Sequence, residues 1–223
     1  MIDDANLYDF HYFANRDYGI DPKREKAYAQ ERKRIWLHAK KPGNILDVGC
    51  GTGDFIAGLD DRWVKFGFEP AEYAAEIAAK KGIQMARALR TIESESMDVV
   101  VFRGTLQHIN DPVMSLAQVA RILRRGGLLI ILATPDADSL VYRIWHNLPA
   151  LDWPRNWIVF GSHELQNIIH RLNFENIEVT HPYWSTPYAS PLSDFFNFFI
   201  SLFLGWRKFA FPGNMFELYS VKK

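Results

Sequence analysis

Cysteine is almost absent from this sequence. Its single cysteine, Cys50, can form no disulfide within the chain and cannot build a cysteine-based zinc site, so we expect no metal centre. A chain with one thiol suits a reducing compartment, and we expect it in the cytoplasm. The first residues, Met1–Ala5, are acidic and carry no apolar run, which argues against a secretory signal peptide.

Long apolar runs and net charge are also missing. A membrane-spanning helix needs ~20 apolar residues, and the closest stretch, Phe195–Trp206, is too short. The 26 basic and 26 acidic side chains give a formal net charge of +0. Nothing therefore draws the chain as a whole toward nucleic acid, and we expect no nucleic-acid partner.

Basic residues are nevertheless concentrated in the segment Pro22–Lys41, which is predicted to begin with a helix over Pro22–Ala39. They are Lys23, Arg24, Lys26, Arg32, Lys33, Arg34, Lys40 and Lys41. Asp21 is the predicted cap of this helix, and Pro22 suits its first position. The favoured interpretation is a solvated helix face. The alternative is a contact for an anionic substrate or for phospholipid headgroups.

Strand and helix patterns alternate along the rest of the chain. The predicted strands are Asn44–Gly49, Trp63–Glu69, Ile83–Ala88, Met97–Arg103, Leu128–Ala133, Glu175–His181 and Met215–Val221. The predicted helices are Gly53–Leu59, Ala71–Lys81, Asp111–Leu123, Asp138–Asn147 and Ser162–Leu172. Such alternation predicts an α/β fold, with helices on both faces of a parallel sheet and the ligand at the carboxyl ends of its strands.

The most informative segment, Ile45–Asp54, reads Ile-Leu-Asp-Val-Gly-Cys-Gly-Thr-Gly-Asp. Glycine lets the backbone turn tightly and approach a ligand, but dinucleotide enzymes use a similar turn. Asp47 and Asp54 flank the turn; they would repel a pyrophosphate and favour the ammonium and sulfonium of S-adenosylmethionine. Glu69, about twenty residues past the turn, can accept hydrogen bonds from two ribose hydroxyls, which fits either cofactor.

Four motifs in this order resemble the class I S-adenosylmethionine-dependent methyltransferases, and within them the type 11 and type 23 groups, which include ubiquinone/menaquinone biosynthesis-like enzymes. The motifs are Ile45–Gly53, Phe66–Pro70, Met97–Pro112 and Leu123–Ile130. The resemblance implies a doubly wound, mostly parallel, seven-stranded Rossmann-like sheet in the order 3-2-1-4-5-7-6, with strand 7 antiparallel. It also implies a single domain, 1–223, made of an N-terminal helical lid (1–41), a cofactor-binding core (44–135) and an acceptor-side half (136–223) with an aromatic insertion (182–213).

The resemblance also assigns residues by position. The cofactor-binding set is Asp47, Gly49, Cys50, Gly51, Gly53, Glu69, Pro70, Arg103 and Gly104. The lid and acceptor-side set is Tyr12, Phe13, Arg103 and Trp157. The sequence departs from the family pattern twice. Ala86–Arg90 offers no acidic residue to the adenine, and Gln107-His108 stands where relatives have Glu-His.

Methyl transfer from a sulfonium is an in-line displacement, so the enzyme mainly has to align acceptor, methyl carbon and sulfur. A general base is needed only for a poor nucleophile such as an alcohol. His108 is the candidate base, and the alternative is a structural histidine that caps the following helix. Arg103 either binds an acceptor carboxylate or phosphate, or pairs with a nearby acid.

An aromatic segment, 195–208, lies between the last two predicted strands. As a helix it would be apolar nearly all round, interrupted only by Asn197 and Ser201. Three interpretations compete: a packed lid, an interfacial helix with Trp206, Arg207 and Lys208 at its edge, or a homodimer contact. The interfacial helix would make the protein membrane-peripheral and would suit a lipid-linked acceptor.

The expected reaction is therefore S-adenosylmethionine-dependent methyl transfer to a small-molecule acceptor, with S-adenosylhomocysteine as product. We expect O-methylation of a hydrophobic, lipid-linked or sugar-type substrate. One alternative is an RNA or protein methyltransferase that uses the basic N-terminal helix. Others are a non-catalytic S-adenosylmethionine-binding module, which the intact glycine loop disfavours, and an NAD(P) oxidoreductase, which Asp47 and Asp54 disfavour.

Overall fold

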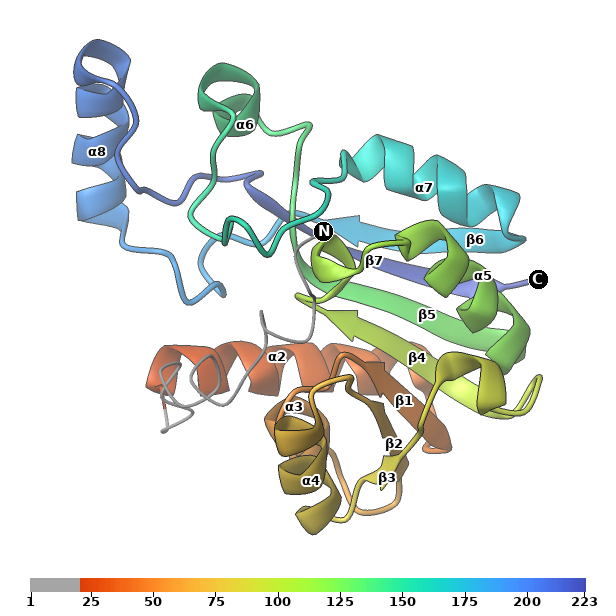
Figure 1. Ribbon diagram of the computed structural model, residues 1–223. Coiled ribbons are helices and arrows are strands. Elements are labelled where there is room, and N and C mark those ends of the chain that lie inside the picture. Colours follow the sequence, from red (N-terminus) through yellow and green to blue (C-terminus); the bar gives the residue numbers. More distant parts are fainter. Residues whose placement is uncertain (1–20) are drawn as a thin grey trace.

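A seven-stranded mixed sheet forms the centre of the computed structural model, which describes residues 21–223 (Figure 1). Its strands are β1 (Asn44–Val48), β2 (Val64–Phe68), β3 (Gln84–Met85), β4 (Met97–Arg103), β5 (Leu123–Pro135), β6 (Phe174–Thr180) and β7 (Met215–Lys222). Their order is β3-β2-β1-β4-β5-β7-β6, and β7 runs antiparallel to both β5 and β6. The predicted strand order and the antiparallel seventh strand are confirmed.

Helices cover both faces of this sheet. One face carries α2 (Pro22–Ala39), α3 (Asp54–Ala57) and α4 (Glu72–Lys80), and the other carries α5 (Pro112–Ile122) and α7 (Ser162–Arg171). Side chains alternate along β4, so Val99 and Val101 enter the core beneath α2, whereas Val100 and Phe102 enter the core beneath α5. All four are buried, as expected for a central strand with both faces covered.

The basic helix α2 begins at Pro22, as predicted. Arg32 donates hydrogen bonds to two backbone oxygens at the start of α3, at 2.8 and 2.9 Å. Arg34 forms ion pairs with Glu178 of β6 and Glu217 of β7, at 2.6 and 2.7 Å. The solvated-face interpretation is therefore wrong for these two arginines, because they fasten α2 to α3 and to the β6–β7 edge.

Two strands differ in extent from their predicted ranges. β3 has two residues instead of six, and it pairs only with β2 at the edge of the sheet. β5 begins at Leu123, directly after α5, because Leu123 already pairs with Met97 before the register shifts. Gly126, at φ 75°, lies in that irregular stretch. The glycines therefore interrupt the strand instead of preceding it.

Two further helices, α6 (Leu140–Trp145) and α8 (Pro191–Leu204), stand side by side beyond the carboxyl ends of the parallel strands (Figure 1). Trp145 of α6 packs edge-on against Phe198 of α8, with 6.2 Å between ring centroids. α8 is offset from the predicted segment 195–208 because Gly205, at φ 85°, ends it. Within residues 21–223, no helix is both long and apolar enough to cross a membrane.

Candidate functional site

The turn after β1 has a backbone conformation that glycine adopts easily. Gly49, Gly51 and Gly53 have φ angles of 75°, 55° and 79°, all in the left-handed region. A Cβ on Gly49 would overlap the side chain of Thr105, whose hydroxyl donates a hydrogen bond to the Gly49 carbonyl at 3.3 Å. The turn is thereby held closely against the end of β4.

The carboxylate of Glu69 reaches this turn from the neighbouring strand. Its two oxygens accept hydrogen bonds from the backbone N–H groups of Gly51 at 2.9 Å and Ala71 at 3.0 Å. Burial raises the pKa of Glu69, and the two N–H donors counteract that rise. Glu69 directly follows β2, so the parallel pairing of β1 with β2 brings it to the glycine turn.

Asp47 is the most deeply buried acid near the turn. Its side chain is 2% exposed, and its Oδ1 has no hydrogen-bond partner among residues 21–223. Burial raises the pKa of Asp47 to about 7; Arg103 opposes the rise, and Glu69 and Glu31 add to it. A buried carboxylate oxygen without a donor is costly. A cation placed next to it would therefore be bound favourably.

Asp54, the other acid that flanks the turn, has partners of its own. Its Oδ2 accepts a hydrogen bond from the hydroxyl of Thr52 at 2.7 Å, and its Oδ1 pairs with the ammonium of Lys81. Part of the negative charge expected at the turn is therefore neutralised. Asp47 is therefore the acid at the turn with a carboxylate oxygen, Oδ1, that has no hydrogen-bond partner among residues 21–223.

A cavity of about 1060 Å³ opens beside the turn at the carboxyl ends of the strands. Predicted site residues that line it together are Asp47, Gly49, Cys50, Gly51, Glu69, Pro70, Arg103, Gly104, His108 and Trp157. Gly53 is not among the residues that line the cavity; it is the N-cap of α3, and a Cβ there would overlap Ile83. The volume lies at the upper end of the roughly 300–1,000 Å³ typical of small-molecule sites.

Arg103, at the end of β4, is paired with an acid. Its Nε lies 2.6 Å from one carboxylate oxygen of Glu31 on α2, and its second nitrogen contact to Glu31 is 3.2 Å. The guanidinium carbon also lies 4.2 Å from the ring centroid of Tyr28. Of the two interpretations of Arg103, the structure therefore supports the pairing with a nearby acid.

His108 lies in a short 3₁₀ turn, Leu106–His108, after β4. Its Nδ1 is 3.0 Å from the backbone carbonyl oxygen of Arg155, which can only accept, so in the neutral ring Nδ1 carries the proton. Nε2 is then the acceptor nitrogen, and the side-chain amide nitrogen of Gln107 lies 3.4 Å from it. His108 does not cap α5, because Asp111 caps it by accepting a hydrogen bond from the N–H of Met114 at 2.9 Å. The structural contact of His108 is instead its hydrogen bond to the Arg155 carbonyl.

Several residues of the cavity wall gave no signal in the sequence. They are Tyr28 and Glu31 on α2, Thr105 after β4, and Met215 and Glu217 on β7. The ion pair between Arg34 and Glu217, 183 positions apart, helps to bring α2 to β7. Local sequence patterns cannot reveal such a contact. The predicted lid residues Tyr12 and Phe13 lie outside the described residues.

Comparison with known proteins agrees with this geometry. A family model described as a methyltransferase domain matches residues 20–179, well over half of the chain. An uncharacterized protein of Methanocaldococcus jannaschii is 26% identical over 160 residues, which cover 70% of this chain and 76% of the relative. A ubiquinone/menaquinone biosynthesis C-methyltransferase of Campylobacter jejuni is 27% identical over 134 residues, which cover 53% of this chain and 56% of that enzyme.

Solved structures share the fold. A S-adenosylmethionine-dependent methyltransferase of Archaeoglobus fulgidus superposes with a TM-score of 0.63 at 18% identity, covering 96% of this chain and 100% of that one. At this identity, the similarity concerns the architecture alone. The family match, the strand order and the glycine turn lead to one conclusion: the chain belongs to the methyltransferase domain family, within the class I S-adenosylmethionine-dependent methyltransferases.

Proposed function

We propose that the glycine-turn end of the cavity binds S-adenosylmethionine. The backbone of Gly49 and Gly51, which lines the cavity, suits the methionine portion, and the carboxylate oxygen of Asp47 without a partner among residues 21–223 suits its ammonium. The carboxylate of Glu69 has lone pairs left for two ribose hydroxyls. When bound, this cofactor supplies an electrophilic methyl group on a sulfonium. Gly104, which directly follows β4, lines the same cavity.

We further propose that the methyl acceptor is a small hydrophobic molecule that is methylated on oxygen. The observation that carries this proposal is the continuity of the cavity, which runs from Asp47 and Glu69 to Tyr28, His108 and Trp157. Aromatic walls suit a flat, apolar acceptor. The main task of the chain is then to align this acceptor with the methyl group. We place the reaction in the cytoplasm or at its membrane surface.

The direct test is to incubate the protein with S-adenosylmethionine and a panel of phenols, quinols, lipid-linked alcohols and sugars, and to measure S-adenosylhomocysteine. We expect turnover with at least one hydrophobic phenol or quinol. Nuclear magnetic resonance of the product distinguishes methylation on oxygen from methylation on carbon. Turnover with RNA or protein alone would overturn the small-molecule proposal.

His108 is proposed as the general base, acting through Nε2. A His108→Ala variant should lower kcat for an alcohol or phenol acceptor by about 100-fold. Affinity for S-adenosylhomocysteine should stay unchanged, because the cofactor residues are intact. The matched control is His163→Ala, whose side chain is 85% exposed. A His108→Ala enzyme with wild-type kcat at every pH would eliminate the base role.

Asp47 should make cofactor binding pH-dependent. Its pKa is raised to about 7 mainly by burial, so without a ligand the carboxyl is protonated below about that pH. An ammonium beside it favours the carboxylate and lowers that pKa. Affinity for S-adenosylhomocysteine should therefore fall as the pH drops below 7, approaching about tenfold per pH unit. Isothermal titration calorimetry measures this slope, and an Asp47→Asn variant should bind more weakly, without the slope. A flat profile in the native protein would contradict the prediction.

A further inference from the structure

The outward face of α8 is apolar and uncharged. Its exposed large side chains are 46% to 83% exposed, and they are Leu192, Phe195, Phe196, Phe199, Leu202, Phe203 and Leu204. The one charged residue of the helix, Asp194, is buried and satisfied. Its two carboxylate oxygens accept hydrogen bonds from the backbone N–H groups of Ser190 at 2.7 Å and Ala210 at 2.9 Å. Exposure of this face to water is therefore unfavourable in free energy.

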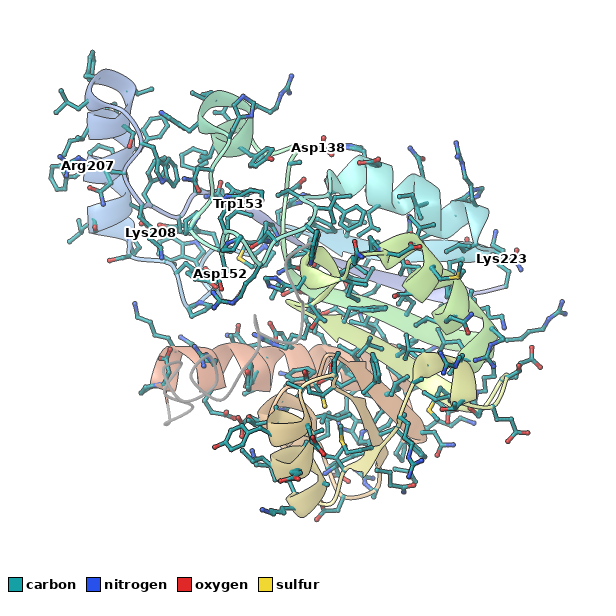
Figure 2. The ribbon with its side chains drawn as sticks, in the orientation of Figure 1. Asp138, Asp152, Trp153, Arg207, Lys208 and Lys223 are labelled. Atoms are coloured by element: carbon teal, nitrogen blue, oxygen red, sulfur yellow. The ribbon has the colours of Figure 1, made fainter. Side chains whose placement is uncertain are left out.

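The polar side chains Asn197 and Ser201 of α8 form hydrogen bonds with the chain that follows the helix. The Ser201 hydroxyl accepts a hydrogen bond from the N–H of Arg207 at 2.9 Å, and the Asn197 amide donates to the carbonyl of Lys208 at 3.2 Å. These bonds hold the returning chain against α8. As a result, Arg207 and Lys208 lie beside the helix, where both are exposed (Figure 2).

Helix α6, which packs against α8 through Trp145 and Phe198, also exposes apolar side chains. Its Leu140 and Ile144 are 54% and 50% exposed, and its Arg143 is exposed as well. We call the outward face of α8, these three residues, Arg207 and Lys208 the α6–α8 surface. It combines a large apolar area with three exposed cations. The only acidic residue between positions 182 and 213 is the buried Asp194.

We propose that the α6–α8 surface docks the protein on an anionic phospholipid bilayer. The aromatic and aliphatic side chains of α8 would enter the boundary between headgroups and acyl chains, while Arg143, Arg207 and Lys208 contact phosphates. The charges favour lipid over a second copy of this chain. In a two-fold dimer, the same surface would face itself, and it has no exposed acid in α6 or the segment 182–213 to meet the three cations.

The docking surface is joined to the acceptor side of the cavity. Between β6 and α8, the segment 182–190 contributes Pro182, Thr186 and Tyr188 to the cavity wall. In the same segment, the hydroxyl of Tyr183 donates to Asp194 of α8 at 2.9 Å. Docking therefore brings the cavity wall close to the bilayer. A membrane-dissolved acceptor would have a short path to it, a consequence that rests on the proposed function.

Flotation of the full chain with vesicles tests the docking. The probes are vesicles of phosphatidylcholine alone and vesicles with equal amounts of phosphatidylcholine and phosphatidylglycerol. We expect binding to the anionic vesicles. A Phe196→Asp/Phe203→Asp variant should weaken it by roughly 100-fold or more, because two exposed phenyl groups no longer enter the bilayer. An Arg207→Gln/Lys208→Gln variant should weaken it by roughly 30-fold.

The matched control is Leu37→Asp on α2, a leucine that is 66% exposed but lies outside the α6–α8 surface. It should float like the unaltered chain. Titration with S-adenosylhomocysteine in vesicle-free buffer should give one affinity for all variants, which separates docking from the cofactor site. Absence of flotation, or equal flotation with neutral vesicles, would overturn the proposal. So would a dimer in sedimentation velocity that Phe196→Asp/Phe203→Asp dissociates while flotation is unchanged.

Discussion

An Arg103→Met variant is expected to lose about 3–5 kcal/mol of unfolding free energy. Arg103 is the ion-pair partner of Glu31, with Nε 2.6 Å from a carboxylate oxygen, and its guanidinium covers the ring of Tyr28. Methionine fills a similar space but leaves the Glu31 carboxylate, which is 7% exposed, without this partner. Urea unfolding at neutral pH, followed by circular dichroism, measures the loss.

Two further variants separate charge from packing. Replacing both partners, in Glu31→Leu/Arg103→Met, should recover most of the stability, because a buried ion pair exchanged for apolar groups is often neutral. Arg62→Met should change stability little, because Arg62 and its partner Asp60 are exposed to solvent. An Arg103→Met protein that unfolds at the same urea concentration as the native chain would show that the buried pair contributes nothing.

A Glu69→Ala variant should bind S-adenosylhomocysteine at least about 100-fold more weakly. In the proposed complex the Glu69 carboxylate accepts hydrogen bonds from two ribose hydroxyls. Hydrogen bonds to a charged group contribute about 1.5–3 kcal/mol each. The same carboxylate also holds the glycine turn through the N–H groups of Gly51 and Ala71. Removing it therefore affects both the ligand and the loop that receives it. Isothermal titration calorimetry measures the change.

The control for Glu69 is Glu76→Ala, an exposed acid on α4 that does not line the cavity. The affinity of the Glu76→Ala variant for S-adenosylhomocysteine should equal that of the native chain. Glu69→Gln should be intermediate, because the amide keeps one acceptor oxygen but turns an NH₂ group toward a second N–H donor. An unchanged affinity in Glu69→Ala would remove this residue from the proposed site.

Much of the fold was predictable because its signals are local. Asp21 caps α2 by accepting a hydrogen bond from the N–H of Lys23, two residues away, and Pro22 supplies the first helical position. β4 has the predicted bounds, Met97–Arg103, because β-branched residues fill a strand buried on both faces. The extent of β3 was not predictable, because an edge strand with one neighbour is limited by that neighbour.

The extent of α8 shows how a local signal can be misinterpreted. The aromatic run continues past Gly205, so a helix over 195–208 looked reasonable from composition. In the structure, the chain turns back at Gly205. The N–H of Arg207 then donates to the hydroxyl of Ser201 and not to a carbonyl of a continuing helix. The helix also starts early, at Pro191, because Asp194 anchors its first turn through the N–H of Ser190.

Local signals in the sequence predicted the glycine turn and the cofactor class, and the strand order followed from the resemblance of the four motifs to the methyltransferases. The pairing of Arg103 with Glu31, 72 positions away, and the contact of His108 Nδ1 with the Arg155 carbonyl, 47 positions away, were visible only in the folded chain. The exposed face of α8 was likewise visible only there. Such contacts form between elements that meet only after folding, so no local periodicity or spacing encodes them.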